Sequence, residues 1–421
     1  MAVPTTTIES EVRSYSRSWP VVFTHGRGSR LYDEDDRAYL DFFAGASALN
    51  YGHNHPALKQ ELLRYVERDG VTHSLDMFTG ARTAFLHELD ARVLQPRGLD
   101  YKVQFPGPTG TNSVEAALKL ARKVTGRQTV VAFTGAFHGM SLGSLAVTGN
   151  ASKRAGAGVP LGLTWRLPYD GFGGGKVCGL TLLESMLDDS SSGMDLPAAV
   201  IVETVQGEGG VNPARLTWLA DLADVCARRG ILLVLDDIQM GCGRTGPFFS
   251  FEAAGIVPDI VCLSKSISGY GLPMALTLFR SELDVWSPGE HNGTFRGNNP
   301  AFVTATAALR EFWSDDSLEK QTMVRELLLR EHLGELAHEH EEHVTQARGR
   351  GLVWGLAFRD PRLARRTADE AFARGLLVET AGSRDEVVKL LPALTTTDDE
   401  LTEGLDILRA SVATAVRGRA G

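Results

Sequence analysis

The spacing of apolar positions divides the chain into short and long segments that alternate. Short runs rich in β-branched residues are bounded by turn residues, and between them lie longer stretches in which apolar residues recur at helical period. The predicted strands lie at residues 102–105, 129–133, 199–204, 231–236, 260–264 and 275–279. This alternation is typical of an α/β fold in which helices cover a mostly parallel sheet.

The clearest predicted helix covers residues 112–123 and follows a Pro-Thr-Gly turn. Its apolar residues, among them Val114, Leu118 and Ala121, fall on one face. Asn112 with Glu115 resembles the capping box that begins many helices. The sequence therefore predicts a capped helix between the first two strands.

The texture of the sequence changes near residue 300. Long, charged, amphipathic segments follow, and strand-like runs lie at residues 352–358 and 387–391. We therefore expect a second, smaller lobe in the C-terminal part of the chain.

Composition and charge limit the class of protein. The chain has 421 residues, of which 43% are hydrophobic and 23% charged, so it is long enough for a large core divided between two lobes. A net charge of -9 argues against the basic surface that nucleic acids bind. The longest apolar stretches have strand length, and the first twenty residues lack a charged stretch followed by an apolar run. We expect a cytoplasmic protein that binds neither nucleic acid nor membranes.

Neither the cysteines nor the histidines indicate a metal site or a disulfide. The four cysteines lie far apart, contain no CxxC pair and fit reduced thiols packed as small hydrophobic residues. They are Cys178, Cys226, Cys242 and Cys262. The run HEHEEH at residues 338–343 lacks the H-E-x-x-H spacing of a zinc helix, so we interpret it as a solvated helix surface. We expect no bound metal.

Lys265 is the first candidate for chemistry. It comes directly after an apolar strand and before a glycine-rich turn. An amine at that place can be partly desolvated, lose its proton and attack an aldehyde. On its own, a lysine at a strand end more often points into solvent.

Asp236 changes the interpretation of Lys265. It ends the preceding strand, and the carboxyl ends of neighbouring strands are where open α/β sheets bind ligands. A carboxylate there can keep a pyridine nitrogen protonated, which makes the ring an electron sink. A turn or helix-cap role is the alternative for Asp236. Together the two residues favour chemistry that depends on pyridoxal phosphate (PLP).

Other loops are suited to the rest of such a cofactor. Residues 107–112 run from a strand into a helix start, where backbone N–H groups and threonine hydroxyls can face a phosphate. Thr294 lies in a Gly/Asn-rich turn and could reach a phosphate from another subunit. Phe137 follows a strand and could stack on a ring, with His138 beside it. Ordinary turns, caps and core packing are the alternatives.

These motifs together resemble the class III, or ω-amino acid, PLP aminotransferases. The resemblance covers nearly the whole chain in order and rests on TGT at 109–111, EAALK at 115–119, FHG at 137–139, Glu203, QGEGG at 206–210, DDIQ at 236–239, GRTG at 243–246 and Lys265. It implies the PLP-dependent fold type I. We expect a large domain at 51–299 with a mostly parallel seven-stranded sheet, a smaller α+β domain at 300–421, and an N-terminal segment at 1–50 that joins the smaller lobe.

The resemblance also implies roles for individual residues. Lys265 would bind the cofactor as a Schiff base and move the proton, and Asp236 would pair with the pyridine nitrogen. The other cofactor contacts implied are Phe137 and Ile238 on the ring faces, Gln239 at the phenolic oxygen, Gly110 and Thr111 at the phosphate, His138 and Glu203 nearby, and Thr294 from the partner chain. A homodimer or a dimer of dimers, with the site at the interface, is then expected.

Longer strings resemble one branch of the class, the diaminobutyrate aminotransferases of ectoine biosynthesis. They are ALNYGH at 48–53, THSLDM at 72–77, TGTN at 109–112, DDSSSG at 188–193, GYGLPMA at 269–275 and GEHNGTFRGNN at 289–299. This resemblance implies transfer of the amino group of L-glutamate to L-aspartate 4-semialdehyde. Another ω-aminotransferase acting on ornithine, 4-aminobutyrate or a related diamine is the alternative, and a catalytically silent relative is a third.

The chain departs from the class at one position that concerns the substrate. Glu208 matches the carboxylate that pairs with an arginine in some members, but VVKLLP at 387–392 places Lys389 where many relatives carry that arginine. A lysine is a point charge and does not grip a carboxylate with two parallel hydrogen bonds. Arg296 is the candidate replacement. We therefore expect Glu208, Arg296 and Lys389 to bind substrate.

Overall fold

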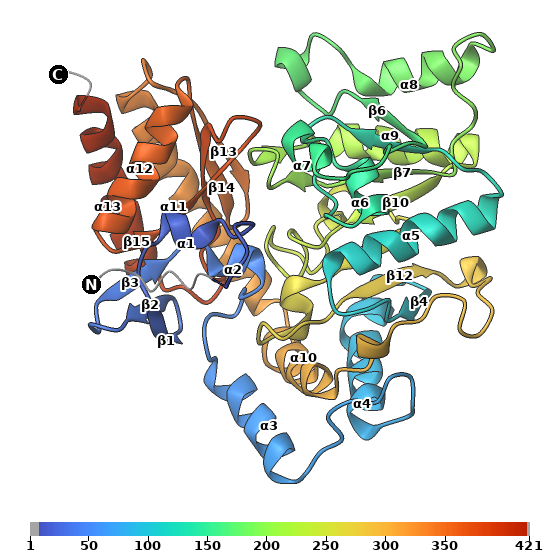
Figure 1. Ribbon diagram of the computed structural model, residues 1–421, viewed down its shortest axis with the longest axis horizontal. Helices are drawn as coiled ribbons and strands as arrows, with labels where there is room; N and C mark the ends of the chain where they lie inside the picture. The colour runs from blue at the N-terminus through green and yellow to red at the C-terminus, as the bar shows by residue number, and fades with distance from the viewer. Residues whose placement is uncertain (1–7, 419–421) are drawn as a thin grey trace.

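The computed structural model describes residues 8–418 and has two lobes (Figure 1). The larger lobe is built on a seven-stranded sheet, ordered β4-β12-β11-β10-β7-β5-β6. Its strands are β4 (Tyr101–Gln104), β5 (Val130–Phe133), β6 (Thr164–Leu167), β7 (Ala199–Val202), β10 (Leu232–Asp236), β11 (Ile260–Leu263) and β12 (Leu276–Arg280). Only β12 runs antiparallel to its neighbours, so the mostly parallel seven-stranded sheet is confirmed.

Helices cover both faces of this sheet because its strands are apolar on both sides. On one face, α5 (Gly110–Thr125) packs Val114, Leu118 and Ala121 against strand residues such as Ile201 and Val234. On the other face, α9 (Leu216–Arg229) packs its apolar side chains against residues such as Val200 and Leu235. Alternate residues of each strand therefore belong to different cores.

The start of α5 differs from the sequence prediction. The capping box joins Thr109 and Asn112, whose Oδ1 accepts hydrogen bonds from the Thr109 backbone N (3.2 Å) and Oγ1 (2.8 Å). The predicted pair of Asn112 with Glu115 is therefore wrong by one turn. Thr109 is extended, with φ -123°, so the helix begins at Gly110 and Asn112 becomes its third residue.

The smaller lobe contains two four-stranded sheets. One consists of the antiparallel strands β13 (Val344–Arg350), β14 (Val353–Phe358), β17 (Val387–Leu390) and β16 (Glu379–Ala381). The other joins β1 (Phe23–Arg27), β2 (Arg30–Asp33) and β3 (Ala38–Asp41) to β15 (Leu376–Leu377). Because β3 pairs with β15, the N-terminal strands lie in the same sheet as a C-terminal one.

Long helices complete the smaller lobe and the base of the molecule. The helices α11 (Ser317–Glu339), α12 (Pro361–Ala373) and α13 (Asp398–Arg417) pack together beside the sheets (Figure 1). Below the large sheet, α10 (Asn299–Phe312) packs on α3 (Pro56–Glu67) and α4 (Gly80–Leu89). The boundaries at residues 50 and 299 stay predictions, and residues 1–7 of the N-terminal segment lie outside the described part of the chain.

The structure also bears on disulfides, membrane-spanning helices and metal binding. All four cysteines are free thiols, and three of them are buried. Within residues 8–418, no helix has both the length and the apolar character needed to cross a membrane. The same residues contain no group of three or more side chains placed to hold a metal ion.

Arg244 connects the two lobes through a buried guanidinium group. Its side chain is fully buried, and it lies in the loop after β10. Its nitrogens donate hydrogen bonds to Ser47 Oγ (3.0 Å) and Asn50 Oδ1 in the N-terminal segment. They also donate to the backbone oxygens of Leu352 (3.0 Å) and Pro392 in the C-terminal lobe. One side chain therefore holds three parts of the chain together.

Replacing Arg244 with Met is expected to lower the free energy of unfolding by about 3–5 kcal/mol, because buried oxygen acceptors in the N-terminal segment and the C-terminal lobe lose their donor. Denaturant unfolding followed by tryptophan fluorescence measures the change. Arg215→Met is the matched control, since Arg215 pairs with Asp170 while its side chain is 72% exposed, and it should change stability far less. Equal effects of the two substitutions would contradict the connecting role of Arg244.

Candidate active site

Lys265 lies immediately beyond the carboxyl end of β11. Ser264 separates it from the strand, and Lys265 begins a short 3-10 turn with φ +53°, a conformation that non-glycine residues adopt rarely. Burial lowers the pKa of its ammonium group, although the nearby Glu208 carboxylate acts in the opposite direction. Strained backbone and a depressed amine pKa are both typical of functional lysines.

Asp236 lies beside Lys265 because β10 and β11 run parallel, with Asp236 opposite Cys262 in register. Its carboxylate is buried and is held on two sides. Oδ2 lies 2.7 Å from His138 Nδ1, and Oδ1 accepts a hydrogen bond from Ile238 N at 3.2 Å. The carboxylate is thereby fixed in orientation at the sheet edge.

Glu203 anchors the loop that carries Phe137. It lies just after β7, and its Oε2 accepts a hydrogen bond from Phe137 N at 3.1 Å. Burial and the neighbouring Asp236 raise the pKa of Glu203 well above its usual value. Its role here is to position the backbone of residues 137–139 close to the strand ends.

The start of α5 lies on the same side of the sheet. Gly110 and Thr111 form its first turn, and Thr111 Oγ1 is 2.6 Å from the hydroxyls of both Ser141 and Ser144. A Cβ atom on Gly110 would come within 3.0 Å of the Ile238 side chain, so a glycine allows this close approach. The free N–H groups of this 16-residue helix suit an anion.

These residues enclose a cavity of about 180 Å³. Its lining contains every residue predicted to contact the cofactor except Thr294. The lining residues are Gly110, Thr111, Phe137, His138, Gly139, Glu203, Glu208, Asp236, Ile238, Gln239, Met240 and Lys265. Residues from five separate segments of sequence therefore converge on one cavity.

Thr294 and Arg296 do not line that cavity within the single chain. They form a short turn, in which His73 Nε2 donates a hydrogen bond to the Thr294 backbone oxygen at 2.6 Å. Arg296 Nη1 donates to Asn292 Oδ1 at 3.1 Å. The structure thus brings neither residue to Lys265.

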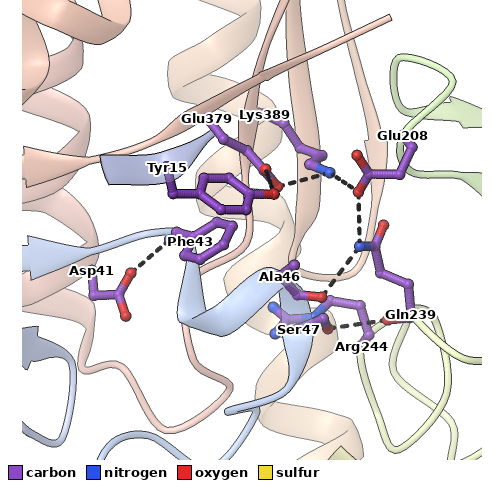
Figure 2. A network of polar contacts seen from close by, with 10 residues as sticks. All are labelled: Tyr15, Asp41, Phe43, Ala46, Ser47, Glu208, Gln239, Arg244, Glu379 and Lys389. Carbon is purple, nitrogen blue, oxygen red and sulfur yellow. Dashed lines mark hydrogen bonds and ion pairs between the residues drawn. The ribbon is translucent and has the colours of Figure 1, made fainter. Parts of the chain in front are cut away.

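Lys389 lies behind Glu208, fully buried between two carboxylates (Figure 2). Its Nζ is 2.7 Å from Glu208 Oε1 and 2.8 Å from Glu379 Oε1. Tyr15 donates a hydrogen bond to the other Glu379 oxygen at 3.1 Å, and Gln239 Nε2 lies 3.2 Å from Glu208 Oε1. Lys389 does not line the cavity, so direct contact with a substrate would require Glu208 to move.

The ionisation of Glu208 and that of Lys389 depend on each other. Burial would raise the pKa of Glu208, but Lys389 and Lys265 outweigh that effect and lower the pKa to about 2. Burial would likewise lower the pKa of Lys389, and the two carboxylates outweigh it and raise the pKa. Glu208 and Lys389 are therefore both charged at neutral pH.

Several residues around the site were not found from the sequence. Glu379 faces Lys389 because β16 and β17 pair antiparallel with these two residues in direct register, and a register between short strands cannot be read from a single sequence. Ser141 and Ser144 contact Thr111 from the start of α6 (Leu142–Val147). Lys153 carries its charge 5.2 Å from the Phe137 ring centroid, and no local motif marks it.

Comparison with known proteins agrees with this geometry. The family description "Aminotransferase class-III" matches residues 12–412, and the chain belongs to that family. A diaminobutyrate-2-oxoglutarate transaminase from Streptomyces avermitilis is 63% identical over 407 residues, which is 96% of each chain.

Two solved structures share the fold over nearly the whole chain. An ornithine aminotransferase from Toxoplasma gondii has a TM-score of 0.84 at 26% identity, covering 98% of this chain and 94% of its own. An amine transaminase from an uncultivated Pseudomonas species, in a PLP-bound form, has a TM-score of 0.83 at 25% identity, covering 97% and 98%. The chain is a PLP-dependent transaminase of fold type I.

The cavity residues fit PLP. Lys265 supplies an amine with a lowered pKa, Asp236 supplies a fixed buried carboxylate, and α5 begins at Gly110 where a phosphate needs donors. His138 Nε2 and the cavity lining add polar groups, since that nitrogen is buried without a hydrogen-bond partner among the described residues. An amine, an anion and an anion-binding helix start are the three features that PLP requires.

Replacing Lys389 with Met is expected to destabilise the protein by about 3–5 kcal/mol, because two carboxylates then lack their shared cation. The loss should be full above pH 4.5 and shrink below it. The reason is that Glu208, whose pKa is lowered from 4.5 to about 2, contributes its full stabilisation to the wild type above pH 4.5 and loses it progressively as the pH falls toward 2. Unfolding in urea at several pH values tests this.

The double variant Lys389→Met with Glu379→Gln is the control for the charge argument. Neutralising one of the two carboxylates should recover part of the lost stability, since less uncompensated charge stays buried. Equal stability of the single and double variants would show that shape and not charge determines the effect.

Proposed function

We propose that this transaminase moves the amino group of L-glutamate to L-aspartate 4-semialdehyde and yields 2-oxoglutarate and L-2,4-diaminobutyrate. The observation that carries the proposal is the 63% identity, over 96% of both chains, to a relative with the corresponding name. The two half-reactions share one cavity, so glutamate must leave as 2-oxoglutarate before the aldehyde enters.

Individual residues take the following proposed roles. Lys265 binds PLP covalently and, when released, moves the proton at the substrate carbon that carries the amino group. Asp236 pairs with the pyridine nitrogen, held in place by its contact with His138. When bound, PLP draws electrons from that carbon, which allows its proton to leave. The protein's own task is to orient the ring and to hold and move the proton.

The ring and the phosphate are held by the remaining cavity residues. Phe137 and Ile238 lie against the two ring faces, and Gln239 approaches the phenolic oxygen. Gly110 and Thr111 bind the phosphate at the start of α5. Glu203 holds the Phe137 loop through its hydrogen bond to Phe137 N.

We further infer a homodimer, or a dimer of two dimers, in which Thr294 of one chain reaches the phosphate of its partner. Thr294 does not line the cavity of its own chain, which supports this arrangement. Phe78 and Phe295 expose 97% and 67% of their surfaces in the single chain, which a second copy would cover. Arg296 then contributes to the substrate site of the partner chain, and Lys389 contributes to the substrate site of its own chain.

Location and pathway belong to the same proposal. We place the enzyme in the cytoplasm, because glutamate and the semialdehyde are intracellular metabolites, and assign it to ectoine biosynthesis on the motif strings between residues 48 and 299. Turnover of ornithine or 4-aminobutyrate is the second candidate activity, since the ornithine aminotransferase shares the fold at 26% identity. A silent relative is disfavoured by the intact pair Asp236 and Lys265.

Purified protein with PLP, glutamate and aspartate 4-semialdehyde is expected to form diaminobutyrate. The value of kcat/KM in the reverse direction, with 2-oxoglutarate as acceptor, should be at least about tenfold higher for diaminobutyrate than for ornithine or 4-aminobutyrate, the discrimination of one well-placed polar contact. Chromatographic measurement of the amino acids tests this. Equal turnover of the three amines would favour the broader ω-aminotransferase.

Lys265→Ala is expected to abolish transamination, because no other lysine lines the cavity within the described residues. The wild type with PLP should show the visible absorbance of lysine-bound cofactor, and the variant should lack it. Ser266→Ala, next to Lys265 but hydrogen-bonded to the Ser47 backbone oxygen, is the control and should keep the band. A wild type without the band would contradict the assignment of Lys265.

A further inference from the structure

Glu208 lies where three cavities adjoin. It lines the cavity of about 180 Å³ that contains Lys265, and it also lines two outer cavities of about 500 and 280 Å³. Phe137 is shared by the inner cavity and the larger outer one. The two outer cavities have four lining residues in common, namely Asn150, Lys153, Glu208 and Gly382. Glu208 and Phe137 therefore form the border between the cofactor cavity and the space outside it.

Glu208 presents one carboxylate oxygen outward. Its Oε1 is taken by Lys389 (2.7 Å) and Gln239 (3.2 Å), whereas no described residue donates a hydrogen bond to Oε2. About 26% of the side chain is exposed. Lys389 is in turn shared with Glu379, so its positive charge is divided between two carboxylates. Glu208 is a fixed anion with a free acceptor that faces the cavities.

Lys153 is the cation that lines both outer cavities, whereas Arg365 lines the smaller one and lies 3.6 Å from Asp369. Lys153 lies on the short helix α7 (Ala151–Ala155), where Asn150 Oδ1 accepts a hydrogen bond from Lys153 N at 3.0 Å. Its Nζ lies 5.2 Å from the Phe137 ring centroid, a cation–π contact that directs the side chain toward the cavity border. Among residues 8–418 no carboxylate forms an ion pair with Lys153. An anion and a cation thus line the two outer cavities together.

Diaminobutyrate has a matching distribution of charge. Its reacting amino group is on C4, and its C2 carries an ammonium and a carboxylate that do not react. Glu208 and Phe137 line the same cavity as Lys265 and also the larger outer cavity, so with C4 at Lys265 the C2 groups would extend toward this border. A carboxylate and an ammonium side by side are the complement of such a zwitterionic head group.

We propose that Glu208 and Lys153 together bind the α-amino acid head group of the substrate whose terminal amino group reacts. Glu208 Oε2 accepts hydrogen bonds from the α-ammonium, and Lys153 Nζ donates to the α-carboxylate. Lys389 and Glu379 position Glu208 from behind. The inference rests on the proposed function. It makes Glu208 and Lys153 the residues that select substrates with both a terminal amino group and an α-amino acid head group.

Three amines test the Glu208 contact and the Lys153 contact independently. Diaminobutyrate has both head-group charges, 4-aminobutyrate lacks the α-ammonium, and 1,3-diaminopropane lacks the carboxylate. Each amine is mixed with the PLP-loaded enzyme without a 2-oxoglutarate acceptor, and the conversion of the cofactor from its aldehyde to its amine form is followed by absorbance. A single half-reaction keeps the carboxylates of the second substrate out of the measurement.

Lys153→Met is expected to lower the ratio of kcat/KM for diaminobutyrate to that for diaminopropane by about 10- to 100-fold, the range of a charge-assisted hydrogen bond. Glu208→Gln should lower the ratio of diaminobutyrate to 4-aminobutyrate by a similar factor. Lys153→Arg should restore most of the first ratio because it keeps the cation. Lys176→Met, an exposed lysine that lines none of the three cavities, is the matched control.

The outcomes are distinguishable. Thermal unfolding of each variant identifies a folding defect, and the ratios of rates within one variant cancel a general loss of active enzyme. Equal losses for all amines, or an unchanged ratio in either variant, would overturn the paired head-group site while the wild type still converts diaminobutyrate. A wild type that does not convert diaminobutyrate would instead overturn the proposed function on which the site rests.

Discussion

The parallel pairing of β10 with β11 is the constraint on which the active site depends. Because Asp236 lies opposite Cys262 in that register, the carboxylate and the Lys265 turn emerge at the same edge of the sheet. Parallel strands place all their carboxyl ends together, so loops after β5, β7 and β4 reach the same edge. Phe137, Glu203 and Gly110 arrive there from three different loops. The direction of the strands therefore determines where the cavity lies, and the side chains determine what it can bind.

Buried charge in this protein is arranged in two contrasting ways. Arg244 is satisfied by neutral oxygens of the chain, and burial lowers its pKa to about 9, which still leaves it charged at neutral pH. Lys389 is instead satisfied by two carboxylates and carries a raised pKa. The first arrangement joins segments of backbone, whereas the second fixes the charge of a side chain, Glu208, that faces the cavity. A buried cation that joins backbone segments is thus paired with neutral oxygens, whereas a buried cation beside the cavity is paired with carboxylates.

Much of the fold and the inner site could be predicted because strand ends are marked in the sequence. The runs that end at Asp236 and before Lys265 are apolar and continuous, as buried parallel strands require. β6 was not predicted, because its Thr-Trp-Arg-Leu sequence is half-buried at the sheet edge and has no apolar run. Glu379 and Lys153 were not predicted for another reason. Their significance depends on the register of β16 with β17 and on a contact with Phe137, and neither leaves a local pattern.

The bonds of Arg244 also bear on how this enzyme can move. Its guanidinium joins Ser47 and Asn50 to the backbone at Leu352 and Pro392. A rigid rotation of the C-terminal lobe away from the large sheet would break several buried hydrogen bonds at once. Access for substrates must then come from side chains and short loops at the rim of the cavity. The two lobes therefore keep one arrangement, and the motion that admits substrate is confined to the rim of the cavity.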